Sequence, residues 1–209
     1  MSWTKFEALP NYFGGKRKLV KDIFKHIQKK DGVFIDAFLG GGSVSLWAKA
    51  KGYKVICNDI AERSYITGKV FIENSRTKLA DEDLARLFIE TKHNQFIEKN
   101  YVPKLFVKST AQFLDNAFAA VREQTAPGTT KRYLLLLLLV KFLGRVRQFG
   151  KFTHTSDTID LNNENYEWPL RSKSHATKSI YMIQHPFINL LCLKHVINKG
   201  VFDKGKHFS

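Results

Sequence analysis

Three consecutive glycines, residues 40–42, constrain the fold of this 209-residue chain more than any other feature, because of what lies on either side of them. The apolar run 33–38 precedes them and is typical of a buried parallel strand. A helix is predicted over 43–51, with Gly52 ending it, and a second strand follows over 53–57. Strand, glycine loop, helix and strand in this order predict a βαβ unit, so the fold class is α/β.

The glycine loop also predicts a ligand site. Unpaired N–H groups at a strand end and a helix start point to one place, and the absence of Cβ lets a ligand approach the backbone. Asp59 follows the second strand, where it can accept hydrogen bonds from ribose hydroxyls. These residues alone also fit three other interpretations of the loop: a structural turn, a nicotinamide site or a flavin site. The sequence lacks G-x-G-x-x-G, which disfavours a dinucleotide site.

A second glycine signature, Asn11-Tyr12-Phe13-Gly14-Gly15-Lys16, lies upstream of the first strand and leads into a helix predicted over 16–30. It is not a Walker loop, because Arg17 follows the lysine where that loop needs Ser or Thr. Together with Asp36-Ala37-Phe38-Leu39-Gly40-Gly41-Gly42-Ser43 and Asn58-Asp59, it resembles the motifs of the Dam-like DNA adenine-N6 methyltransferases. The resemblance covers residues 11–60 and departs at Ala37, where the family has proline.

The resemblance implies a partial Rossmann-like methyltransferase fold that uses S-adenosylmethionine as its cofactor. Tyr12 and Lys16 would line its methionine or adenine side, Asp36 and the backbone of 40–42 would hold its amino-acid part, and Asp59 would hold its ribose. Carboxylates and aromatic faces suit the cationic sulfonium. The expected cofactor-binding residues are Tyr12, Gly15, Lys16, Asp36, Phe38, Gly40, Gly42, Ser43 and Asp59.

The charge of the chain points to a polyanionic partner. It has 34 Lys and Arg against 19 Asp and Glu, a formal net charge of +15. Neutralising phosphates releases counterions, so an excess of this size favours nucleic acid over a merely solvated basic surface. Two cysteines in 209 residues form no disulfide framework, and Cys57 is expected to be a buried small hydrophobe.

After residue 60 the pattern becomes helical. Helices are predicted over 61–75, 81–98, 111–121, 132–143 and 187–196, and residues 200–202 could open a strand. No run typical of a parallel strand occurs between about residues 60 and 180. We therefore predict a cofactor-binding part at 1–78, a mostly helical target-recognition and DNA-binding region at 79–185, and a return to the methyltransferase domain at 186–209.

In the family that the chain resembles, the region between the cofactor motifs and the catalytic motif recognises the DNA target. The candidate phosphate contacts are Arg145, Arg147 and Lys151, which lie in a stretch of Arg, Gly and Phe. Each could equally be an ordinary surface cation. The expected partner is double-stranded DNA.

The family's catalytic motif, Asp-Pro-Pro-Tyr, is missing from the sequence. The five prolines are Pro10, Pro103, Pro127, Pro169 and Pro186, and no two are adjacent. The chain thus looks like the N-terminal part of such an enzyme. It could be one subunit of a split methyltransferase whose second polypeptide carries Asp-Pro-Pro-Tyr, a truncated gene, or a relic without transfer activity.

Two further readings compete with an adenine-N6 methyltransferase. One is a non-enzymatic nucleic-acid-binding protein, and the other a nicotinamide-type Rossmann enzyme, which the glycine spacing disfavours. The longest apolar run, 134–140, is far shorter than the roughly 20 residues of a membrane span, and no signal peptide is recognised. We therefore expect a cytoplasmic protein with no membrane contact.

Overall fold

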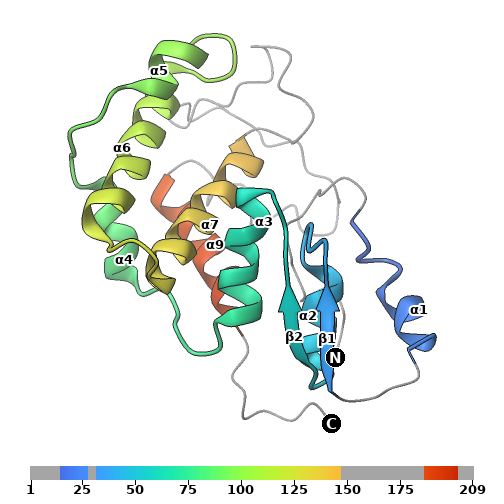
Figure 1. Cartoon of the computed structure of the whole chain (residues 1–209). Helices are drawn as coiled ribbons and strands as arrows, with labels where there is room; N and C mark the ends of the chain where they lie inside the picture. The colour runs from blue at the N-terminus through green and yellow to red at the C-terminus, as the bar shows by residue number, and fades with distance from the viewer. Residues whose placement is uncertain (1–14, 28–31, 147–185, 202–209) are drawn as a thin grey trace, which may run out of the picture. The chain divides into compact units, whose positions relative to one another are not determined.

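A computed structural model describes residues 15–27, 32–146 and 186–201 of the chain (Figure 1). These residues form a mixed α/β structure, mostly helical, with a small parallel sheet. The chain divides into two compact units: unit 1 comprises Met1–Lys78 and Val196–Ser209, and unit 2 comprises Leu79–His195. The functional division that the sequence suggests stays a prediction.

Unit 1 is built on the βαβ unit that the glycine loop predicts. Strands β1 (Val33–Asp36) and β2 (Lys54–Cys57) pair in parallel, with Ile35 opposite Ile56, and helix α2 (Ser43–Ala50) connects them and packs against both. The predicted strand–helix–strand order is therefore confirmed. Helix α1 (Val20–Lys25) is shorter than expected, because residues 17–19 form a turn before it.

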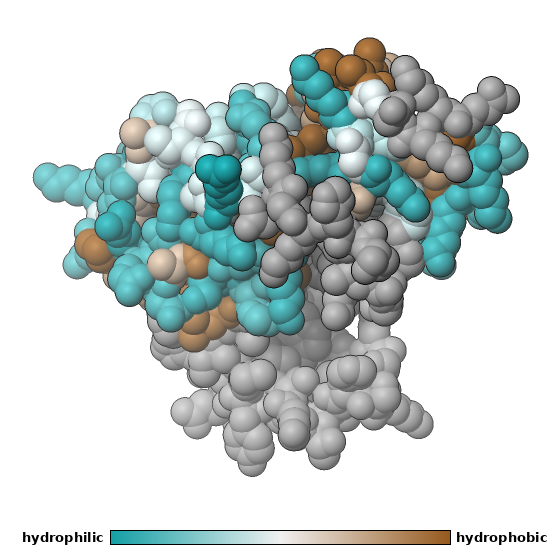
Figure 2. All heavy atoms as spheres, turned by 90° about the horizontal axis from the view of Figure 1, so that it is seen from below, coloured by the Kyte–Doolittle hydropathy of each residue, from teal (hydrophilic) through white to brown (hydrophobic). Residues whose placement is uncertain are grey.

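The prediction that the first strand is buried is wrong. Side chains of a strand alternate between two faces, and α2 covers one face of this sheet. On the other face, Val33, Ile35 and Ile56 are 55%, 70% and 51% exposed. Figure 2 shows hydrophobic side chains at the surface of the described residues in brown, gathered most densely near the upper edge of the view.

After β2 the helix expected over 61–75 forms in two parts. Helix α3 (Glu62–Thr67) passes directly into a π-helix, η2 (Gly68–Glu73). The Nζ of Lys49 in α2 donates to the carbonyl oxygens of Phe71 and Asn74, at 2.7 and 2.8 Å. This double contact ties the end of the π-helix to α2.

Helix α9 (Pro186–Gly200) contributes its last residues to unit 1. The expectation that residues 200–202 open a strand is wrong for Gly200, which is the final residue of this helix. A Cβ at Gly200 would lie 2.6 Å from Cε1 of Phe71, so the close approach of α9 to η2 requires glycine here.

Regular structure in the described part of unit 2 is helical throughout. Helices α6 (Lys108–Gln124) and α7 (Thr130–Val146) contain the predicted segments 111–121 and 132–143 and confirm them. The longest apolar run supplies the core, and the fully buried large side chains include Leu114, Leu134, Leu135, Leu137, Leu138, Leu139 and Phe142. Within the described residues, no helix combines the length and hydrophobicity needed to cross a membrane.

The continuous helix predicted over 81–98 is wrong. Helix α4 (Asp81–Ala85) passes into a 3-10 turn, η3 (Arg86–Phe88), and α5 begins only at Phe96 and ends at Tyr101. Asn116 of α6 bonds the backbone at the break. Its Nδ2 donates to the carbonyl oxygens of Leu87 and Ile89, which a continuing helix would have used itself, and its Oδ1 accepts from the N–H of Thr91.

Candidate functional site

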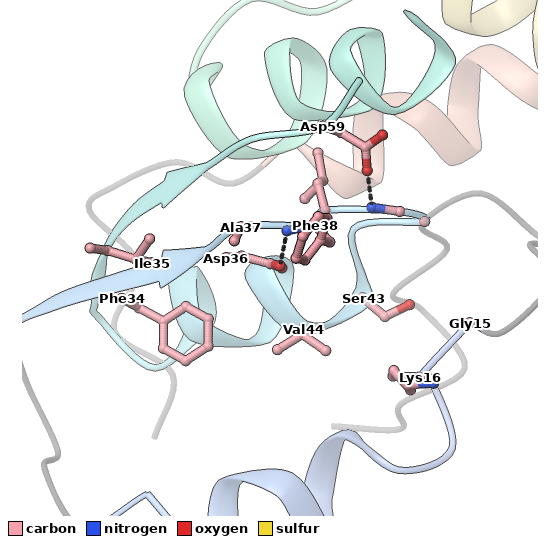
Figure 3. A pocket seen from close by; sticks show the side chains of 13 residues that line it. Gly15, Lys16, Phe34, Ile35, Asp36, Ala37, Phe38, Ser43, Val44 and Asp59 are labelled. Carbon is pink, nitrogen blue, oxygen red and sulfur yellow. Dashed lines mark hydrogen bonds between the residues drawn. The ribbon is translucent and has the colours of Figure 1, made fainter. Parts of the chain in front are cut away.

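A pocket of about 550 Å³ opens at the carboxyl ends of the two strands of unit 1 (Figure 3). Open parallel sheets bind ligands at this edge, because the loops after the strands meet there. Seven residues that the sequence predicts for a cofactor site line this pocket: Gly15, Lys16, Asp36, Phe38, Gly40, Ser43 and Asp59. Gly42 lies next to the lining residues Gly41 and Ser43, and Tyr12 lies outside the described residues.

The glycine loop has a backbone that other residues would strain. Gly40 and Gly42 have φ of 53° and 79°, in the left-handed region that glycine adopts without steric cost. Gly42 is the residue before the first turn of α2, and no side chain caps this helix start. The loop therefore leaves backbone N–H groups at the pocket, as a site for an anionic or polar ligand requires.

Asp59 connects this loop to the loop after β2. Its Oδ2 accepts a hydrogen bond from the N–H of Gly40 at 2.7 Å, and its Oδ1 accepts one from the N–H of Ala61 at 2.8 Å. The turn at Asn58 adds to the link, since its carbonyl oxygen accepts from the N–H of Leu39 at 2.9 Å. Asp59 thus holds the two loops together, and each of its carboxylate oxygens retains a lone pair for a ligand.

Asp36, at the end of β1, is oriented by a residue that the sequence analysis missed. The hydroxyl of Ser45 donates to Oδ2 of Asp36 at 2.6 Å, and the N–H of Phe38 donates to Oδ1 at 3.3 Å. Ser45 is fully buried in α2. No local motif marks this serine, because its role depends on how α2 folds back along β1.

Gly15 and Lys16 reach the pocket through the packing of α1. Phe24 of α1 stacks on Phe34 of β1 with ring centroids 5.5 Å apart, and it also contacts Trp47 at 6.1 Å. This aromatic cluster fixes the helix whose preceding residues line the pocket. In Figure 3 Lys16 lies across the pocket from Asp59, so a cation and the two carboxylates face the same space.

The pocket can make both polar and stacking contacts with a ligand. Asp36 and Asp59 accept hydrogen bonds from hydroxyl or ammonium groups, and Lys16 can pair with an anion. Phe38 is 88% exposed, which leaves its ring free to stack on a planar or cationic group. Within the described residues, no group of three or more His, Cys, Asp or Glu could hold a metal ion.

Cys57, at the end of β2, is a free cysteine whose surroundings disfavour the thiolate. The structure places it at intermediate exposure rather than in the fully buried position expected. Burial raises the pKa of its thiol, and the nearby Asp36 carboxylate raises it further. The raised pKa favours the protonated thiol over the thiolate at neutral pH.

The predicted DNA contacts fall largely outside the described structure. Arg147 and Lys151 lie outside the described residues, and Arg145 lies in the last turn of α7, where only the backbone is described. Their roles stay predictions.

Comparison with protein families assigns residues 12–186 to the family model described as D12 class N6 adenine-specific DNA methyltransferase. This match spans both glycine signatures and most of unit 2.

Two curated proteins are similar to the chain. It is 28% identical over 196 residues to the type II methyltransferase M2.HphI of Haemophilus parahaemolyticus, covering 93% of the chain and 56% of the relative. It is 25% identical over 213 residues to the modification methylase StsI of Streptococcus sanguinis, covering 94% of the chain and 30% of the relative. The chain therefore spans about half or less of the length of these relatives, and no solved structure matches it.

Proposed function

The chain belongs to the family of D12 class N6 adenine-specific DNA methyltransferases, and from that premise we propose that it binds S-adenosylmethionine in the pocket of unit 1 and serves methyl transfer to adenine N6 in DNA. One observation carries the proposal: the glycine loop, Asp36, Asp59 and Lys16, which are separated in the sequence, line the same pocket.

The donor set of the pocket fits this cofactor. Its volume of about 550 Å³ is in the ordinary range for small-molecule sites. In the proposed complex, Oδ1 of Asp36 accepts from the ammonium group, because its contact with Phe38 is long and leaves it the freer oxygen. Asp59 accepts from ribose hydroxyls through the lone pairs that its two backbone donors leave open.

Lys16 and Phe38 complete the proposed site. The ammonium of Lys16 pairs with the carboxylate of the cofactor, and the exposed ring of Phe38 lies against the sulfonium or the adenine. When bound, the cofactor supplies the electrophilic methyl group. The residues of this chain bind and orient it. We further propose that a complete Rossmann-like sheet forms around this βαβ unit.

DNA is the proposed methyl acceptor, and the cytoplasm is the proposed place of action. The net charge of +15 supports binding to the phosphate backbone. Arg145, Arg147 and Lys151 are the proposed phosphate contacts, and the region 79–185 is proposed to recognise the target.

Methyl transfer is proposed to need residues beyond these 209. The sequence contains no adjacent prolines and so lacks the Asp-Pro-Pro-Tyr of the family it resembles. Two observations support further polypeptide at the sheet: the relatives are longer, and one face of β1 and β2 exposes Val33, Ile35 and Ile56. That polypeptide is either continuous with this chain in a longer protein or a separate subunit.

Calorimetry and a transfer assay test the proposal. We expect the chain to bind S-adenosylmethionine, Asp36→Ala to abolish binding, and Asp22→Ala to bind normally, since Asp22 lies exposed on α1 with Lys25 as its partner. Labelled methyl should reach adenine in unmethylated DNA when the chain is mixed with the part of the Haemophilus relative that the alignment leaves uncovered.

Two outcomes would change the conclusion. Absence of cofactor binding, both alone and in that mixture, contradicts the proposal. Cofactor and DNA binding without transfer in any mixture would favour the alternative, a non-catalytic DNA-binding relic of a methyltransferase.

A further inference from the structure

We propose that Gly68, the first residue of the π-helix η2, is a positioning residue for the glycine loop, because its missing side chain makes room for the side chain of Leu39. The inference rests on the proposed cofactor site, since the loop that Leu39 belongs to lines that pocket. Gly68 lies outside both glycine signatures and is not itself a lining residue of the pocket.

Leu39 is held between the start of α2 and the start of η2. Its side chain is 6% exposed. A Cβ at Gly68 would lie 3.1 Å from Cδ2 of Leu39, and a Cβ at Gly42 would lie 3.7 Å from its Cδ1. The two methyl groups of Leu39 therefore face two glycines. Only the approach to Gly68 is closer than an ordinary contact with a Cβ, so the absence of a side chain matters for Leu39 at that position.

The backbone of Leu39 carries this restraint to the pocket. Its N–H donates to the carbonyl oxygen of Asn58 at 2.9 Å, and its carbonyl oxygen accepts from the N–H of Gly42 at 2.8 Å. The next residue, Gly40, donates its N–H to Asp59 at 2.7 Å. A displacement of the Leu39 side chain would therefore shift the three amides that shape the loop.

Gly68 is not needed for the backbone of its own helix. Its φ of −59° and ψ of −48° are right-handed helical, so alanine fits without backbone strain and is the better helix former. The π-helix that starts here widens the turn, and such turns recur at functional sites. The tight contact of a Cβ at this position is therefore with Leu39, while Sγ of Cys57 would lie at an ordinary distance of 3.5 Å.

Gly68→Ala separates positioning of the loop from stability of the fold. The added methyl should displace Leu39, because 3.1 Å is tighter than an ordinary van der Waals contact. We expect the affinity for S-adenosylmethionine to fall about tenfold, a change equivalent to 1.4 kcal/mol. The melting temperature should stay close to that of the unmodified chain, because better helix propensity offsets the local crowding.

Hydrogen–deuterium exchange of the cofactor-free chain provides a readout that does not depend on cofactor binding. The amides of Leu39, Gly40 and Gly42 should exchange faster in Gly68→Ala, while amides of α2 stay protected. Glu62→Ala, an exposed change in α3, is the matched control and should alter neither exchange nor affinity. Gly68→Ala with Leu39→Val, which shortens the displaced side chain, should restore both.

Amide exchange in Gly68→Ala decides whether Gly68 positions the glycine loop. Unchanged loop exchange in Gly68→Ala would overturn it, and so would a uniform rise across unit 1, which would indicate a packing role only. If loop exchange rises but the unmodified chain does not bind the cofactor, the positioning role stands and the proposed function fails. If Gly68→Ala does not fold, recovery of folding by the added Leu39→Val supports the inference, and failure of the double variant to fold overturns it.

Discussion

Replacement of Asp59 tests both the structure of the pocket and its proposed function. Its two carboxylate oxygens join the N–H groups of Gly40 and Ala61, so Asp59→Ala removes two hydrogen bonds to a charged acceptor at once. The glycine loop then loses its link to the turn after β2. We therefore expect Asp59→Ala to destabilise unit 1 and to abolish binding of S-adenosylmethionine.

The size of the stability loss follows from the geometry. A hydrogen bond to a charged group contributes about 1.5–3 kcal/mol, and two such bonds set the upper limit. Asp59 is only half-buried, so water replaces part of what the two amides lose. After this discount we expect a loss of about 2 kcal/mol in the free energy of unfolding. Asp59→Asn keeps one amide oxygen as an acceptor and should lose about half as much.

Urea unfolding followed by circular dichroism measures the stability loss, and calorimetry measures cofactor binding. Asp22→Ala is the matched control, because it removes a carboxylate from an exposed ion pair in the same unit and should change stability by less than about 0.5 kcal/mol. Salt-dependent DNA binding, measured by fluorescence anisotropy, should persist in Asp59→Ala. An unfolding free energy equal to that of the unmodified chain would refute the linking role, and an equal loss of DNA binding would make Asp59 structural only.

Three further changes test other contacts. Ser45→Ala removes the buried hydroxyl that donates to Asp36 and should lower the free energy of unfolding, measured by thermal unfolding, by about 1–2 kcal/mol. An unchanged free energy of unfolding would mean that Asp36 needs no such partner. Asn116→Ala removes the Oδ1 that accepts from the N–H of Thr91, and it frees the carbonyl oxygens of Leu87 and Ile89. The amide of Thr91 should then exchange faster, and retained protection would show that Asn116 does not hold the chain at this break. Cys57 should resist iodoacetamide at neutral pH, and rapid labelling at pH 7 would contradict the raised pKa of its thiol. Because the folded state holds the thiol proton more tightly than the unfolded state, the free energy of unfolding should fall as pH rises through the ordinary thiol range.

Local pattern was sufficient to predict the βαβ unit and the place of the pocket. An apolar run followed by glycines and then a helix can be recognised within a short stretch of sequence. The carboxyl ends of parallel strands must lie at the same edge of the sheet. Local pattern placed Asp59 at this edge, and the family resemblance implied a role for Asp36; both line the same pocket.

Contacts between distant residues could not be predicted in this way. At the break in the helix after Phe88, the amide of Asn116 bonds carbonyls far away in the chain, and helical periodicity carries no sign of this contact. The exposure of Ile35 likewise depends on which face of the sheet α2 covers, because an apolar run reads the same whether one face is buried or both.

The sequence by itself determined the order of the strands, the glycine loop and the acidic residues at or just after the end of each strand, because these depend on residues close together in the chain. Only the tertiary structure decided how the loop is held: Ser45 orients Asp36, Asp59 bonds Gly40, and Leu39 fits against Gly68. Each of these contacts joins different elements, so its existence depends on packing distances of a few ångströms, which no spacing along the sequence records.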